Sequence, residues 1–245
     1  MAKISKINGK MIDQDRKAYL GICEMLFNNE LHPGQKIANK DLAQRLGVST
    51  TPVIHALLLL ELKGITRRET NRGYFINTIT TQEVEEIFDA RIALEVSLLA
   101  KTLKYLDGTA LKKLEGALHL HDEAVALNDH SKRVMTDLRF HMTLASLSRT
   151  EIQVALLEDL FDRLLLKYSK NFFSVSIIET SQEEHYAIMD AIKEKNLNLL
   201  TDSLSYHLNQ TKARIIQGLS KSLDENNRQV SKYHSFEDIK DGIIF

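Results

Sequence analysis

The sequence predicts a mostly α-helical protein, in which an N-terminal winged helix-turn-helix precedes a C-terminal all-α antiparallel bundle of about six helices. Two observations carry this prediction. Two short helical segments separated by a tight turn precede two β-like runs within residues 40–77, which is the order of a helix-turn-helix followed by a wing. The only prolines are Pro33 and Pro52, so the long helical patterns after residue 79 contain no helix breaker.

The helix-turn-helix is expected from a short helix at 40–46 and a second helix at 51–63. Gly47 begins the tight turn between them. Pro52 lies in the first turn of the second helix, where its missing N–H would be unsatisfied anyway. Gly64 ends that helix as a left-handed cap. Capping oxygens for its first turn are available from Ser49, Thr50 and Thr51.

The remainder of the N-terminal domain is expected to surround this motif. An apolar stripe predicts a first helix from about Lys10 to Phe27, and Ile37 belongs to a short extended segment. The wing is predicted as two strands, Ile65–Arg68 and Tyr74–Asn77, because the residues between them have turn chemistry.

A domain boundary is expected where a Thr80…Glu83 capping box opens a new helix. We therefore predict a winged helix-turn-helix domain at 10–79, an all-helical domain at 80–222, and a tail of unknown structure at 223–245. The bundle helices are predicted at 82–105, 109–128, 131–147, 152–171, 177–195 and 197–220. Their short connections favour antiparallel neighbours.

Composition and charge narrow the class of protein. The chain is 43% hydrophobic and 27% charged, with a single cysteine, Cys23, which excludes a disulfide framework and a cluster of thiolate ligands. No run of 18 apolar residues occurs, so we expect a cytoplasmic protein without a membrane partner. Residues 1–79 carry twelve Lys/Arg against seven Asp/Glu, a net charge of +5, whereas the rest carries −6. A basic N-terminal domain, called the head below, is suited to binding double-stranded DNA.

Four residues of the second domain have the types and spacing of metal ligands. Asp137 and His141 are four residues apart, so they project from one helix face. His185 and His207 lie on later helices, each flanked by apolar residues that turn it inward. Three imidazoles and a carboxylate suit zinc, nickel or manganese, and residue types alone do not decide among these divalent ions. The alternative is that these are ordinary hydrogen-bonded histidines.

Other candidates have less support. The remaining histidines of this domain and the tail, His119, His121, His130 and His234, are expected to face solvent. Arg91 and Glu95 are four residues apart on the first bundle helix, which is consistent with a surface pair. Apolar neighbours leave open that Arg91 faces inward and binds a carboxylate ligand through its planar fork.

Taken together, these features resemble a GntR-family transcriptional regulator of the FadR subfamily with an FCD-type effector domain. The resemblance covers about residues 10–220 and rests on LHPGQKI, DLAQRLGVSTTPV, RGYFI, FDARIALE, DLRFH and the two later histidines. It implies a homodimer, metal ligation by Asp137, His141, His185 and His207, and a small carboxylic acid beside the metal. Six bundle helices rather than seven make the chain similar to the VanR-like branch. Implied DNA-binding residues are Lys40, Ser49, Thr51, Arg72 and Gly73, and we add Thr50 and His55.

The chain departs from this family at its base-reading positions. Similar chains have arginine where this one has Thr50 and Ile54, and commonly glutamate where it has His55. Because arginine is the commonest reader of guanine edges, base readout should be changed or weakened. Arg149 replaces a frequent asparagine, with no consequence that we can derive.

Three functions are compatible with the sequence. The leading hypothesis is a ligand-responsive, metal-containing transcriptional regulator that controls metabolic genes and is not an enzyme. A helical metal-dependent hydrolase is the alternative from another class, because the same ligands can activate water. A hydrolase also needs a general acid or base, and no motif assigns one, although Glu184 next to His185 is available. This alternative leaves the N-terminal domain without a purpose. The third possibility is a metal-binding dimer whose head binds DNA poorly.

Overall fold

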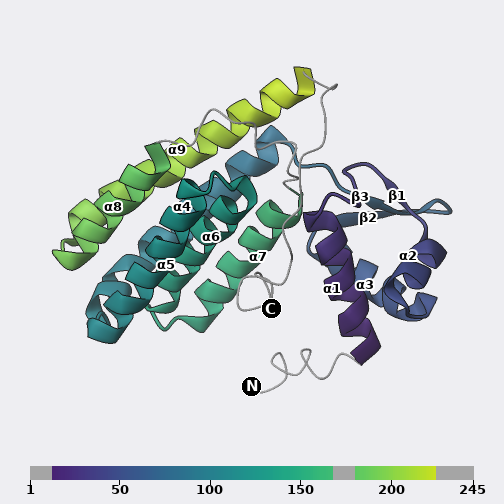
Figure 1. Cartoon of the computed structure of the whole chain (residues 1–245), viewed down its shortest axis with the longest axis horizontal. Coiled ribbons are helices and arrows are strands. Elements are labelled where there is room, and N and C mark those ends of the chain that lie inside the picture. The colour runs from purple at the N-terminus through teal and green to yellow at the C-terminus, as the bar shows by residue number, and fades with distance from the viewer. Residues whose placement is uncertain (1–12, 168–179, 225–245) are drawn as a thin grey trace. The chain divides into compact units, whose positions relative to one another are not determined.

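The computed structural model describes residues 13–167 and 180–224. The chain forms two compact units, Met1–Thr78 and Ile79–Phe245. Nine helices and three short strands occur in the described residues, so the protein is mostly α-helical with a small sheet (Figure 1). The predicted fold class is therefore confirmed.

The first unit is a winged helix-turn-helix. Its helices are α1 (Asp13–Phe27), α2 (Asn39–Leu46) and α3 (Thr50–Leu62), and its strands are β1 (Lys36–Ile37), β2 (Thr66–Glu69) and β3 (Gly73–Ile76). The sheet has the order β1-β3-β2, with both pairs antiparallel. The short segment at Ile37 thus adds a third strand to the predicted two-stranded wing.

Glycines shape the helix-turn-helix at two points. Gly47 has φ +61° and its N–H bonds the carbonyls of Ala43 and Gln44, which ends α2. Gly64 has φ +73° after the last turn of α3, as the sequence predicts. Both conformations are strained for a residue with a Cβ. Helix α3 packs on α1, α2 and β2, and its buried residues are Pro52, Val53, Ala56, Leu57 and Leu60.

The second unit is a bundle of helices with short connections. Its members in the described residues are α4 (Thr81–Lys104), α5 (Gly108–Ala126), α6 (His130–Ser146), α7 (Glu151–Lys167), α8 (Thr180–Lys193) and α9 (Leu197–Asp224). Helix α4 packs against α6, α7 and α9, while α8 packs against α5 and α9. Their buried apolar side chains, including Phe88, Phe140, Ile188 and Leu204, form one core. This packing brings α6, α8 and α9 together.

The helix boundaries differ from the predicted ones by a few residues. Helix α9 continues to Asp224, so residues 223–224 of the predicted tail are helical. Residues 168–171 and 177–179 of two predicted helices, and 225–245 of the tail, lie outside the described residues. His130 begins α6 instead of lying in a loop.

Side-chain caps explain where three bundle helices begin. Thr80 Oγ1 accepts from the N–H of Glu83 at 3.1 Å. Asp107 and Asp129 accept in the same way from Ala110 and Lys132. These bonds satisfy helix N–H groups that have no intrahelical partner. The Glu83 carboxylate, however, contacts Lys167 Nζ at 2.5 Å, so the predicted capping box forms only on the Thr80 side.

No single helix in the described residues is long and apolar enough to cross a membrane. Helices α2 and α3 reach that length and apolar composition only when taken together, and they are bent by 109° at their junction.

Candidate metal centre and nucleic-acid interface

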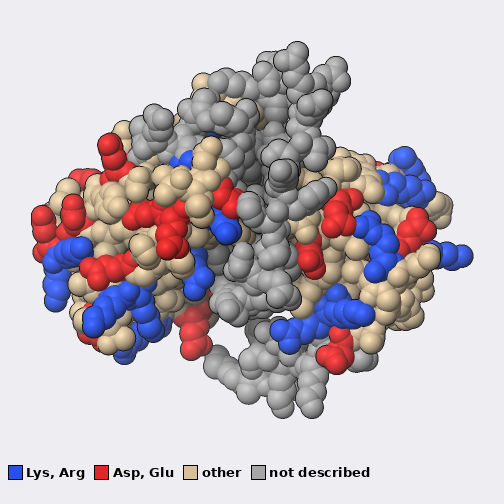
Figure 2. All heavy atoms as spheres, in the orientation of Figure 1, with Lys and Arg blue, Asp and Glu red and all other residues tan. Residues whose placement is uncertain are grey.

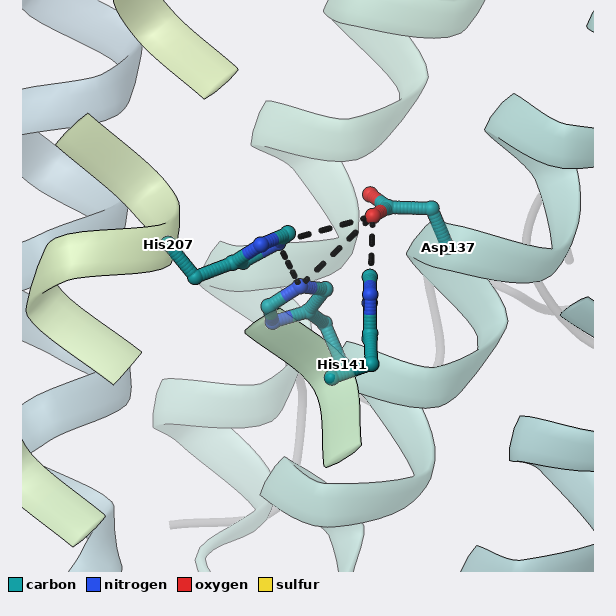
Figure 3. Close-up of side chains that lie close together, drawn as sticks. Asp137, His141 and His207 are labelled. Atoms are coloured by element: carbon teal, nitrogen blue, oxygen red, sulfur yellow. Dashed lines mark hydrogen bonds and ion pairs between the residues drawn. The ribbon is translucent and has the colours of Figure 1, made fainter. Parts of the chain in front are cut away.

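Four side chains from three helices meet in the core of the second unit. Asp137 and His141 come from α6, His185 from α8 and His207 from α9. One potential ligand atom from each lies within 4.8 Å of all the others. Figure 3 shows the rings of His141 and His207 directed toward the Asp137 carboxylate. All three histidines are fully buried.

The sequence explains this convergence locally. The spacing of Asp137 and His141 places both on one face of α6. Ile188 and Met189 on α8, and Leu204 and Leu208 on α9, are buried and turn the faces that carry His185 and His207 inward. Packing of α8 on α9 then brings these two imidazoles within 4.4 Å, measured between ring centroids.

Each histidine is oriented by an acceptor at its Nδ1 atom. His141 Nδ1 donates to Glu95 Oε2 at 2.6 Å, and His207 Nδ1 donates to Glu184 Oε2 at 2.8 Å. His185 Nδ1 donates to the Ser181 carbonyl at 2.7 Å. A carbonyl or ionised carboxylate only accepts, so the proton of each neutral ring lies on Nδ1. The Nε2 atoms then present lone pairs to the centre, as in metal-ligating histidines.

The Nε2 atoms are closely grouped around one carboxylate oxygen. Asp137 Oδ1 lies 3.3 Å from His185 Nε2, 3.5 Å from His207 Nε2 and 4.0 Å from His141 Nε2. The Nε2 atoms of His141 and His207 are 3.1 Å apart. His185 Nε2 has no partner with hydrogen-bond geometry among the described residues. Lone pairs and a carboxylate at these distances repel one another unless a proton on an Nε2 atom or a metal cation lies between them.

The pKa shifts at Asp137 and His207 favour a negative carboxylate beside a positive imidazolium. Burial raises the pKa of Asp137, but contacts with His185 and His207 outweigh it and hold that pKa well below its usual range. Burial lowers the pKa of His207, yet Asp137 and Glu184 outweigh burial and raise it. For His141, burial prevails over the attraction of Glu95 and lowers the pKa. The ionised carboxylate of Asp137 therefore lies beside two imidazoles, His141 and His207, whose pKa values shift in opposite directions.

Two buried carboxylates that support these histidines are themselves paired with arginines. Glu95 Oε1 accepts from Arg91 Nε at 2.9 Å, and Glu184 accepts from both terminal nitrogens of Arg214 at 2.8 and 2.6 Å. Burial raises the pKa of Glu184, but Arg214 and His207 bring it down to about 2. The pKa of Glu95 is likewise lowered, since His141 and Arg91 outweigh burial. The sequence analysis did not predict that Glu95 and Glu184 bind the histidines. The four-residue spacing of Arg91 and Glu95, and the adjacency of Glu184 to His185, were the available indications.

Arg91 lies in the core, which corrects the prediction of a surface pair. Arg91 is 1% exposed and Glu95 3%. The guanidinium lies over the rings of Phe88 and Phe161, at 4.8 and 4.5 Å from their centroids. Its Nη2 has no hydrogen-bond partner within the described ranges. Contacts of Arg91 with a carboxylate ligand stay a prediction.

His121 contradicts the expectation that it faces solvent. It is 2% exposed, its ring centroid is 4.6 Å from that of His185, and its nitrogens lie near the hydroxyls of Thr136 and Ser181. Burial, reinforced by repulsion from His185, lowers its pKa to about 4. The sequence did indicate this burial, because His121 continues the helical spacing of the apolar residues Leu114 and Leu118. His119 does face solvent, whereas the His130 side chain and all of His234 lie outside the described residues.

The predicted DNA-binding residues lie on α2, on α3 and at the wing. Lys40, Thr50 and Thr51 are exposed, and Ser49 precedes α3 in extended conformation without capping it through its side chain. His55 is exposed, with Nδ1 3.2 Å from Asp15 Oδ1 of α1. Arg72 pairs with Glu69 across the turn before β3, and the next residue, Gly73, has φ +91°. In Figure 2 basic side chains stand out on the visible face of the head, interspersed with acidic ones.

Comparisons with known proteins match both units. Residues 14–76 match the family described as bacterial regulatory proteins, gntR family, and residues 86–210 match the FCD domain. An uncharacterized HTH-type transcriptional regulator of Bacillus subtilis, YdhC, is 28% identical over 192 residues, which cover 78% of this chain and 86% of the relative. A regulator from the TAR-I ttuE-ttuC' intergenic region of Agrobacterium vitis is 31% identical over 133 residues, covering 53% and 77%.

Solved structures support the fold. Escherichia coli McbR/YncC has a TM-score of 0.73 at 22% identity, covering 85% of this chain and 100% of its own. A transcriptional regulator from Rhodococcus sp. RHA1 has a TM-score of 0.72 at 21% identity, with coverage of 84% and 99%.

The matched families and relatives are transcriptional regulators and not enzymes, which confirms the prediction that the chain is not an enzyme. The hydrolase alternative is therefore set aside. The FCD match covers more than half of this chain, and a gntR-type domain precedes it. The chain therefore belongs to the GntR family of transcriptional regulators.

Proposed function

We propose that this regulator is a metal-containing homodimer that binds an operator in double-stranded DNA and responds to a small carboxylic acid, controlling metabolic genes in the cytoplasm. The four residues Asp137, His141, His185 and His207 hold one divalent ion, which is zinc, nickel or manganese. Lys40, Ser49, Thr50, Thr51, His55, Arg72 and Gly73 contact the operator.

One observation carries the metal proposal. Three imidazoles from different helices direct their Nε2 atoms at the partly buried carboxylate of Asp137, while their Nδ1 atoms are occupied by Glu95, Glu184 and the Ser181 carbonyl. Such outer partners fix the tautomer and orientation of metal-ligating histidines. Nitrogen and oxygen donors in this number suit a borderline divalent cation and leave coordination positions open.

The cation, when bound, supplies positive charge that attracts the carboxylate of an effector. The protein's own residues orient the ligands: Arg91 neutralises Glu95, and Glu95 holds His141. Arg214 acts in the same way on Glu184 and His207. Since Arg91 Nε is already occupied by Glu95, we assign Arg91 this indirect part, and direct contact with the effector is the secondary possibility.

The response to effector requires two arrangements of the bundle that bind DNA differently. Ligand bound between α6, α8 and α9 favours one of them, and the segment from Thr78 to Gln82 connects this bundle to the head in sequence. Coupling is reciprocal, so the effector weakens or strengthens operator binding by the same factor as the operator changes effector binding.

Titration of metal-stripped and metal-reloaded protein with duplex DNA tests this function. The probe is the region upstream of the chain's own gene, assayed with and without acetate, lactate, succinate and citrate against an excess of unrelated duplex. We expect salt-dependent specific binding that at least one acid changes only in metal-reloaded protein. Equal DNA affinity in every condition would rule out the proposed switch, and absence of specific binding would support a head with lost function.

A further inference from the structure

Helix α3 presents an apolar face to solvent. Ile54, Leu58 and Leu62 are 41%, 47% and 74% exposed, and their spacing of four residues puts them along one side of the helix. The opposite side carries Val53, Ala56, Leu57 and Leu60, which are fully buried against the rest of the head. The exposed leucines and isoleucine are therefore not needed to complete the core.

The same helix has no side chain that pairs with a purine through two hydrogen bonds. Its sequence, TTPVIHALLLLEL, contains no arginine, lysine, asparagine or glutamine, which are the side chains that recognise guanine or adenine in this way. His55 contacts Asp15, and Glu61 Oε1 accepts from the backbone N–H of Arg68 at 3.1 Å. Polar contacts from α3 are therefore limited to His55, whose Nδ1 lies beside Asp15, and the threonine hydroxyls, and none of these side chains pairs with a purine through two hydrogen bonds.

Basic residues are nonetheless placed on the elements next to α3. Lys40 lies at the start of α2, Lys63 follows α3 directly, and Arg68 and Arg72 belong to the wing. This arrangement supplies phosphate contacts around a helix whose exposed side chains include the apolar Ile54, Leu58 and Leu62. The thymine C5-methyl is the apolar group that base pairs present in the major groove.

We propose that Ile54 and Leu58 read thymine methyl groups, so that the operator half-site is recognised at A·T pairs rather than through guanine. The proposal rests on DNA binding by the head with α3 in the major groove, where the N-terminal half of a recognition helix contacts base edges. Ile54 lies in that half beside Thr50 and Thr51, and Leu58 lies one turn further. Leu62, the last residue of α3, contacts no base.

Selection of binding sites from a randomised duplex, using the full chain, supplies the DNA. Each invariant thymine of the selected site is then replaced by deoxyuridine, which keeps base pairing and removes only the methyl group. We expect each contacted methyl to contribute about fourfold in affinity, the effect of burying one methylene-sized group. The measurement is repeated with Ile54→Ala and Leu58→Ala, and with Leu62→Ala as the matched control on the same helix.

The proposal expects the deoxyuridine penalty to disappear at one position in Ile54→Ala and at another in Leu58→Ala, and to persist in Leu62→Ala. Ile54→Arg should select guanine at the affected position. Equal penalties in all variants, or a selected site whose invariant bases are guanines read by the unaltered chain, would overturn it. Loss of self-association in Ile54→Ala without a change in DNA affinity would also overturn the proposal, because the exposed apolar face of α3 would then join two copies of the chain. Failure to select any site would instead contradict DNA binding itself.

Discussion

Replacing Glu95 by glutamine removes one buried negative charge while preserving the shape of the side chain. Glu95 accepts from His141 Nδ1 at 2.6 Å and from Arg91 Nε at 2.9 Å, and all three residues are buried. In Glu95→Gln the guanidinium of Arg91 lacks its counter-charge. The amide nitrogen of the glutamine also places a donor where one carboxylate oxygen of Glu95 accepts a hydrogen bond.

The expected effects follow from these two contacts. Breaking a buried ion pair from one side costs about 3–5 kcal/mol, and since the amide oxygen still accepts one hydrogen bond we expect about 3 kcal/mol. For a domain of roughly 150–250 residues this lowers Tm by about 6–12 °C. Loss of a group that orients a metal-ligating histidine lowers metal affinity by about 10–100-fold.

Thermal unfolding of the metal-free protein and calorimetric titration with zinc measure the two effects separately. Glu115→Gln is the matched control, because Glu115 pairs with Lys193 at 3.3 Å between α5 and α8 while both are about half exposed. An exposed pair contributes less than about 1 kcal/mol. Combining Arg91→Met with Glu95→Gln should recover part of the stability, because the unpaired charge is gone, but not the metal affinity.

An unchanged zinc affinity in Glu95→Gln would refute the role of Glu95 in orienting His141. If Glu95→Gln and Glu115→Gln lowered Tm equally, the reasoning about the buried charge would be wrong. Full recovery of metal affinity in the double variant would show that the loss came from unfolding alone.

Three further predictions concern single residues. Thr80→Ala removes the cap on the N–H of Glu83 and should lower the unfolding free energy by about 1 kcal/mol, whereas Thr80→Ser should retain it in the same chemical denaturation. Lys195 is exposed and has φ +52°, so Lys195→Gly should raise stability by about 0.5–1 kcal/mol by relieving left-handed strain; a lower denaturation midpoint would contradict this. Arg72→Ala should weaken operator binding and reduce the slope of log affinity against log salt by about one, and an unchanged slope would remove Arg72 from the phosphate contacts.

Local patterns were sufficient to predict the fold. The 3.6-residue periodicity gave the bundle helices, Gly47 and Gly64 gave the ends of α2 and α3, and Thr80, Asp107 and Asp129 cap helices at the expected breaks. These features depend on residues close in sequence, which is why a single sequence was enough to predict them. The strand at Lys36–Ile37 depends on pairing with β3, so its partner was not visible from local sequence.

The candidate site was predicted in part for the same reason. Asp137 and His141 share a helix face by spacing alone, and apolar neighbours indicated that His185 and His207 face inward. The partners that orient the histidines are distant: Glu95 lies on α4 and binds a ring from α6, and Glu184 on α8 binds a ring from α9. Such contacts depend on how helices pack. His121 was misjudged because its burial comes from α6 and α8, although its own helical stripe indicated it.

Metal content of the purified protein tests the central claim most directly. Mass spectrometry of the metal in protein purified without added metal or chelator should give one divalent ion per chain. Replacing His185 and His207 together by alanine should abolish it, with retained helicity checked by circular dichroism. His119→Ala, an exposed histidine of α5, should bind as the unaltered chain does. An equal metal content in the double variant, or no metal in the unaltered chain even after reloading with zinc, nickel and manganese, would contradict a metal centre at Asp137, His141, His185 and His207.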